Sequence, residues 1–183
     1  MTGDSQATGT VLQQRNAPQA LRALDLHPEL IDRLVEFAPD YVDLFTTTAS
    51  DATAATPEQW ARAAIEGARA GGRFMAWRAM LRLRLEPHPW TPPAAARSDA
   101  DHIAGWQIVE NGDRWIRVEA SSRVMTAQMV FQVEAQRVSF ATCVRYDRPG
   151  GAVIWKPVSA IHRRIAPRFL GAAVRRINRA RAT

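Results

Sequence analysis

Apolar and polar residues alternate with a period of two through the middle of the chain. Between residues 106 and 118, apolar residues flank Asn111-Gly112-Asp113, a turn signature that predicts a β-hairpin. Residues 125–134 and 137–146 continue the alternation, each with one mostly apolar and one mostly polar face. We therefore expect a four-strand antiparallel meander whose last two strands are half-buried.

After Pro149-Gly150-Gly151 the apolar residues recur at helical spacing as far as about residue 180. This pattern predicts a long C-terminal helix. Its expected apolar side comprises Ile154, Val158, Ile161, Ile165, Phe169, Leu170, Ala173, Val174 and Ile177. A twisted sheet with one apolar face needs a cover, and we expect this helix to supply it.

The first part of the chain predicts a short helix and a first strand. Residues 28–36 begin with proline, which suits the first turn of a helix, and residues 40–49 are rich in β-favouring side chains. Residues 1–20 are polar, and we expect them to form a disordered or loosely packed segment. Residues 21–183 are then expected to form a single domain.

Two more helices are predicted between the first strand and the meander. Thr56-Pro57-Glu58-Gln59 is a helix start in which Thr56 caps the helix and Gln59 completes a capping box. A second helix is expected over residues 73–85. Residues 86–96 contain four prolines and predict a loop. The fold class that follows is α+β.

The composition limits the cellular compartments and the kinds of chemistry that we expect for this protein. The chain has 183 residues, a formal net charge of +6 and a single cysteine, Cys143, so an intrachain disulfide is excluded. No apolar run approaches the length of a membrane span, and no apolar signal-peptide core is present near Met1. We expect a cytoplasmic protein without a cofactor or metal. The many Ala and Arg and few Lys residues suggest a bacterial genome of high GC content.

The order of the predicted elements resembles the helix-grip proteins, the START-like (SRPBCC-like) superfamily of hydrophobic-ligand binders and cyclases. The run Pro157-Val-Ser-Ala-Ile-His-Arg-Arg-Ile-Ala-Pro167 is similar to one in an uncharacterised bacterial domain family of this kind. That family has an acidic element where this chain reads Ala120-Ser-Ser-Arg-Val124. The resemblance implies an antiparallel sheet wrapped around the C-terminal helix, two short helices after the first strand, and a cavity between sheet and helix.

In such a fold the apolar face of the sheet either fills the core or lines a ligand cavity, and methionine adapts to varied apolar ligands. The leading hypothesis is therefore a protein that binds a small apolar or amphipathic molecule. The expected ligand-binding residues are Trp106, Trp115, Met125, Met129, Phe131, Phe140, Tyr146, Ile161 and His162.

Two alternatives stay open. His162 with an acidic partner could support a cyclase- or hydrolase-like enzyme, but no partner is evident in the sequence, so we lean against an enzyme. No acidic residue follows Asp147, and the arginines at 175, 176, 179 and 181 could bind nucleic acid or an anionic membrane. Nucleic acid is the less favoured partner because aromatic residues are not interleaved with the arginines. A homodimer contact through this helix also stays open.

The other chemistry-bearing residues have structural interpretations that are more common than functional ones. His27, His88 and His102 are scattered over expected loops and lack metal-ligand spacing. Asp99, Asp101 and His102 form a polar group that is either a solvated loop or the mouth of a cavity. Cys143 lies in no context that would activate a thiol.

Overall fold

The computed structural model of the chain describes residues 8–12, 21–22, 24–69 and 98–182. These residues form one antiparallel sheet of seven strands in the order β1-β2-β7-β6-β5-β4-β3. The strands are β1 (Thr8–Leu12), β2 (Tyr41–Thr48), β3 (His102–Ile103), β4 (Trp106–Asn111), β5 (Trp115–Ser121), β6 (Thr126–Glu134) and β7 (Arg137–Arg145). The helices are α2 (Pro28–Phe37), α3 (Pro57–Arg69) and α5 (Gly150–Arg181), with a 3-10 turn, η1 (Ala52–Ala54).

The α+β class, the antiparallel meander and the long C-terminal helix are confirmed. The strand predicted over residues 40–49 is present as β2. The helices predicted to begin at Pro28 and Pro57 are present as α2 and α3. The helix expected over residues 73–85 and the loop over 86–96 lie outside the described residues.

The predicted capping box at the start of α3 is formed in full. The Thr56 backbone N–H donates to Gln59 Oε1 at 2.9 Å, and the Gln59 N–H donates to Thr56 Oγ1 at 3.2 Å. These bonds satisfy backbone donors that have no partner within the helix. Farther along α3, Trp60 is buried and its indole N–H donates to the carbonyl of Ala52 in η1. The start of α3 is thus fixed both by its own sequence and by η1.

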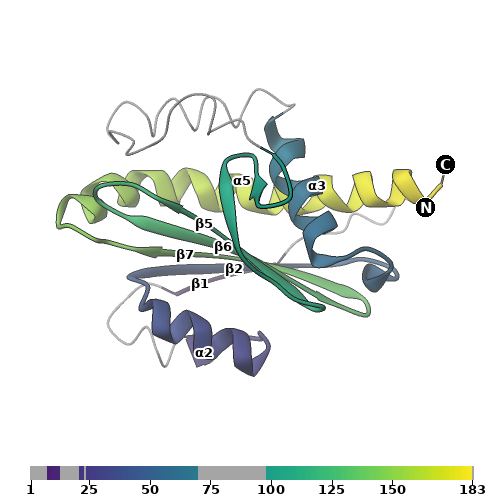
Figure 1. Cartoon of the computed structure of the whole chain (residues 1–183), viewed down its shortest axis with the longest axis horizontal. Helices are drawn as coiled ribbons and strands as arrows, with labels where there is room; N and C mark the ends of the chain where they lie inside the picture. Colours follow the sequence, from purple (N-terminus) through teal and green to yellow (C-terminus); the bar gives the residue numbers. More distant parts are fainter. Residues whose placement is uncertain (1–7, 13–20, 23, 70–97, 183) are drawn as a thin grey trace.

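Helices cover both faces of the sheet (Figure 1): α3 and α5 lie on one side and α2 on the other. Successive residues of β6 and β7 therefore point to opposite faces of the sheet and pack into different cores. Phe131 and Phe140 pack with α3 and α5, whereas their neighbours Val130 and Ala141 pack with α2.

The expectation of half-buried strands is wrong for β6 and β7, which are buried on both faces over most of their length. The polar residues of the second face are retained because they form hydrogen bonds there. Gln132, for example, accepts a 2.7 Å bond from the backbone N–H of His27 at the start of α2.

Part of the N-terminal segment, which the sequence predicts to be disordered or loosely packed, forms a strand. Residues Thr8–Leu12 form β1, which pairs antiparallel with β2 from Thr8↔Thr46 to Leu12↔Val42. The physical reason is that β2 has a free edge opposite β7, and backbone hydrogen bonds can add a strand there whatever the side chains are. Residues 1–7 and 13–20 lie outside the described residues.

The side of α5 that packs against the sheet differs from the side predicted from the positions of the isoleucines. Val158, Leu170 and Ala173 are buried as expected, but Trp155, Ser159 and His162 are buried as well. Ile161, which was expected to face the sheet, is 36% exposed. This rotation brings polar groups of α5 onto the middle of the sheet.

Candidate functional site

A buried polar cluster lies where α5 crosses β2 and β7. The Tyr41 hydroxyl donates to Asp43 Oδ2 at 2.7 Å, and His162 Nε2 lies 3.3 Å from the same oxygen. His162 Nε2 is also 2.9 Å from Thr142 Oγ1. Asp43 is fully buried and His162 is 5% exposed. A proton on Nε2 of the imidazole would let His162 donate to the same carboxylate oxygen that accepts from Tyr41.

The antiparallel register explains why these residues meet. Asp43 and Thr142 are paired across β2 and β7, so their side chains point to the same face of the sheet. Tyr41 and Phe45, two residues to either side of Asp43, share that face because strand residues alternate. His162 reaches the cluster from the buried side of α5.

Aromatic rings surround the polar groups. The ring centroids of Phe45, Phe140 and Trp155 lie 6.3, 6.2 and 5.9 Å from that of His162. Trp155 also packs edge-on against Tyr41, with centroids 5.3 Å apart. The Asp43 carboxylate thus sits in an apolar environment, where charge interactions are stronger than in water.

Two buried polar atoms of this cluster have no hydrogen-bond partner in the described part of the chain: Asp43 Oδ1 and Trp155 Nε1. The first can only accept a hydrogen bond and the second can only donate one. Leaving such a group unsatisfied costs about 1–3 kcal/mol, so a native structure retains few of them. The two atoms therefore mark the cluster as a candidate site rather than an ordinary part of the core.

The environment of the cluster disfavours additional negative charge. Burial, followed by the Asp43 carboxylate, raises the pKa of Tyr41 well above its ordinary value; the nearby Arg163 opposes this shift only in part. The same two causes, in the same order, raise the pKa of the Cys143 thiol on the neighbouring strand. Cys143 is fully buried among apolar residues on the α2 side and is not a candidate nucleophile.

Tyrosine ionisation gives a direct measure of this environment because the chain has only two tyrosines. Burial, and then Asp40, raises the pKa of Tyr146 to about 12, and the pKa of Tyr41 is also raised. Both tyrosines therefore add stability that is fully present below pH about 10 and is lost as the pH rises through the folded-state pKa. We expect near-ultraviolet absorbance to show no phenolate step near pH 10 in the folded protein, and a full step in denaturant. A full step near pH 10 without denaturant would contradict this.

The structure brings together only part of the predicted ligand-binding set. Phe140 and His162 belong to the cluster itself. Six of the predicted residues lie in the cores beneath α3 and α5: Trp106, Met129, Phe131 and Phe140 in the larger one, and Met125 with the partly buried Tyr146 at the end near Trp155.

Two of the predicted residues lie elsewhere. Trp115 faces α2, where its ring packs at a tilt against that of His27, with centroids 4.8 Å apart, and its indole N–H donates to Glu110. Its neighbour Ile116 packs on the α5 side, and because successive side chains of a strand point to opposite faces, Trp115 faces α2. Ile161 lies at the surface of α5 and is 36% exposed. Neither belongs to the site.

The residues predicted from the sequence do not include four members of the cluster: Tyr41, Asp43, Thr142 and Trp155. One signal was available for Asp43. It is an acidic residue in the middle of a strand, and it alternates with Tyr41 and Phe45, which have the burial preference of a core face. Trp155 and His162 are seven residues apart and therefore share one side of a helix, which is the corresponding signal on α5.

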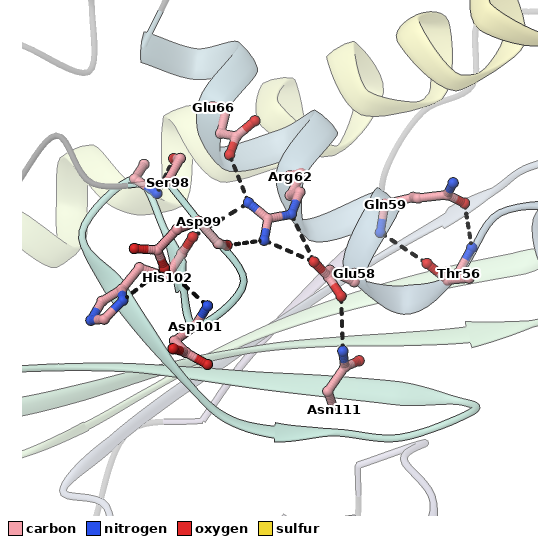
Figure 2. A network of polar contacts seen from close by, with 11 residues as sticks. Thr56, Glu58, Gln59, Arg62, Glu66, Ser98, Asp99, Asp101, His102 and Asn111 are labelled. Carbon is pink, nitrogen blue, oxygen red and sulfur yellow. Dashed lines mark hydrogen bonds and ion pairs between the residues drawn. The ribbon is translucent and has the colours of Figure 1, made fainter.

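The polar group before the meander has a structural role (Figure 2). Arg62 of α3 donates to the carbonyls of Asp99 and His102 and forms ion pairs with Glu58 and Glu66. His102 Nδ1 lies 3.1 Å from Asp99 Oδ1. The network holds α3 against β3 and the turn before it.

The histidines that the structure describes do not converge. His27 contacts Arg114 and Trp115 at the start of α2, His102 belongs to the Arg62 network, and His88 is not among the described residues. Within the residues that the structure describes, no group of three or more His, Cys, Asp or Glu side chains is placed to hold a metal ion.

The basic end of α5 is divided between structural and exposed arginines. Arg176 donates to the carbonyls of Ala63 and Gly67 in α3, and Arg181 pairs with Asp51 at 2.6 Å. Arg175 and Arg179 are exposed. Two of the four arginines considered as an anion-binding set therefore connect α5 to neighbouring elements.

Gly67 and Arg176 should be energetically coupled, because a Cβ on Gly67 would overlap the Arg176 guanidinium. With Arg176 present, Gly67→Ala displaces hydrogen bonds worth about 1.5–3 kcal/mol and is expected to destabilise the protein. In an Arg176→Ala background, the same change should stabilise α3 by about 0.5–1 kcal/mol, the usual gain over glycine in a helix. Urea denaturation of the four proteins measures the coupling. Equal effects in both backgrounds would show that there is none.

Comparisons with protein-family models, with curated proteins and with solved structures found no match for this chain. Among the described residues, none of the helices has both the length and the apolar character needed to cross a bilayer. The function must therefore be inferred from the cluster itself.

Proposed function

We propose that the protein binds a small amphipathic molecule between the sheet and α5, with its polar end at Asp43 and Trp155. The architecture would then be of the helix-grip type. The order β2-β7-β6-β5-β4-β3 with a long C-terminal helix against one face supports this interpretation. Met129, Phe131 and Phe140 are the residues beside the cluster that would contact the apolar part of the ligand.

The observation that carries the proposal is the pair of unpartnered polar atoms, Asp43 Oδ1 and Trp155 Nε1, in an apolar interface. Ligand sites combine mostly apolar walls with a few placed polar groups that fix orientation. A core that served packing alone would gain stability by replacing Asp43 with an apolar residue of similar size. A ligand group that pairs with these atoms would remove their cost.

The test is native mass spectrometry of the freshly purified full chain, with solvent extraction of whatever co-purifies. We expect a discrete additional mass that organic solvent releases, or binding of the apolar fluorophore N-phenyl-1-naphthylamine to the extracted protein. A clean mass together with a fluorophore that does not bind would overturn the proposal.

A second candidate is acid–base catalysis at the same place. The sequence offered His162 no acidic partner, and the structure supplies Asp43 at 3.3 Å from Nε2. A carboxylate beside an imidazole fixes its tautomer and stabilises its protonated form, as a general acid or base requires. Incubating the extracted molecule with wild-type protein and with His162→Gln distinguishes the candidates. A mass change that needs His162 supports catalysis, and an unchanged molecule rejects it.

A further inference from the structure

The chemistry of the cluster restricts the kind of polar end that a ligand can present. Asp43 Oδ1 needs a donor and Trp155 Nε1 needs an acceptor. A hydroxyl or a primary amide offers both. A carboxylate or phosphate offers only acceptors, and an ammonium group offers only donors. Of these head groups, only the first kind carries both the donor that Asp43 Oδ1 requires and the acceptor that Trp155 Nε1 requires.

The carboxylate of Asp43 also disfavours a negatively charged head group. Asp43 is fully buried, and a second anion placed beside it would be repelled with little screening. Within the described part of the chain, the charged or titratable groups in contact with the carboxylate are Tyr41 from β2 and His162 from α5, with Arg163 of α5 close to Tyr41. The Arg163 guanidinium has another partner, since it donates to Ser159 Oγ at 3.3 Å.

Tyr41, whose hydroxyl donates to Asp43 Oδ2, reports the local field. Burial, and then the Asp43 carboxylate, raises the pKa of this tyrosine. An acid that enters this environment is therefore pushed toward its neutral form. A fatty acid would have to take up a proton before it could bind at neutral pH.

We propose that the cluster of Asp43, Trp155, Tyr41 and His162 selects a neutral head group that both donates and accepts hydrogen bonds, such as the hydroxyl of a long-chain alcohol, over a carboxylate or phosphate. This inference rests on the proposed ligand-binding function and names the class of molecule that the site takes.

The test uses three probes with the same alkyl chain: decanol, decanoate and decylammonium. Each competes with N-phenyl-1-naphthylamine for the full-length protein at about pH 8, where decanoate is ionised. We expect decanol to displace the fluorophore at a concentration about tenfold lower than decanoate, the ratio that corresponds to one buried unsatisfied group. Decylammonium should be intermediate, because it can pair with Asp43 but leaves the indole N–H unpaired.

Variants locate the selectivity. Trp155→Phe removes the donor and should weaken decanol binding about tenfold while leaving decylammonium unchanged. Asp43→Asn removes the charge and should narrow or reverse the preference over decanoate. Trp115→Phe is the matched control, because Trp115 lies on the α2 side and its loss should change none of the three affinities.

The outcomes separate the two proposals. If decanoate binds as tightly as decanol, or if Trp155→Phe has no more effect than Trp115→Phe, the head-group inference is overturned while ligand binding stands. If neither the fluorophore nor any of the three probes binds, the proposed function is overturned, and the inference with it.

Discussion

Replacing His162 with alanine is expected to lower the free energy of unfolding by about 1–3 kcal/mol, the usual cost of taking a hydrogen-bond partner away from a buried polar group. Asp43 is fully buried and has Tyr41 and His162 as its polar contacts. Without the imidazole, the carboxylate keeps its burial and loses a donor. Thermal or urea denaturation at neutral pH measures the loss.

His162→Gln is the matched control. The Nε2 amide of glutamine can occupy nearly the same position as Nε2 of histidine and can donate to Asp43. We expect it to recover more than half of the stability that alanine loses. If His162→Ala costs less than about 1 kcal/mol, the histidine and the carboxylate do not stabilise each other, and the cluster would have to be reinterpreted.

The second large effect is expected at the start of α5. A Cβ on Gly151 would lie 2.6 Å from the carbonyl oxygen of Val124 and 3.1 Å from Cβ of Tyr146. The same carbonyl accepts a 3.2 Å hydrogen bond from the Arg148 N–H, so it is not free to move away. Gly151→Ala should therefore destabilise the protein by about 1–3 kcal/mol, as overpacking of a close contact does.

Gly150 provides the control for this substitution, because a Cβ there would meet nothing within 4 Å. Gly150→Ala adds the same methyl group one residue earlier and should change stability by less than about 0.5 kcal/mol. The two variants are compared by urea denaturation. Equal effects would mean that the junction between the β5–β6 loop and α5 is not tightly packed, so that the helix could adjust its position over the cluster.

The site shows where sequence reasoning was effective and where it failed. His162 was predicted as a site residue from its place in the Pro157–Pro167 run, and the structure buries it against the sheet. Its partners were missed because contact between β2 and α5 spans more than a hundred residues of sequence. Nothing local to His162 indicates that Asp43 lies 3.3 Å away.

Trp115 and Ile161 lie away from the cluster for a related reason. In β5 both Trp115 and Ile116 are apolar, so alternation alone cannot say which of them faces α5. In α5, apolar residues occupy much of the circumference, and the isoleucines suggested the wrong buried side. Packing against the sheet decided the rotation of the helix, because Trp155 and His162 match the polar and aromatic groups of β2 and β7.

The sequence by itself determined the local structure of this protein. Strand alternation, the hairpin turn, the capping box at Thr56 and the long helical period after Pro149 each depend on neighbouring residues, and each is present. Only the tertiary structure decided that β1 extends the sheet, that α2 covers its second face, and that Asp43, Thr142 and His162 meet. These features depend on pairing between distant segments, where backbone hydrogen bonds and side-chain complementarity, rather than local periodicity, select the partner.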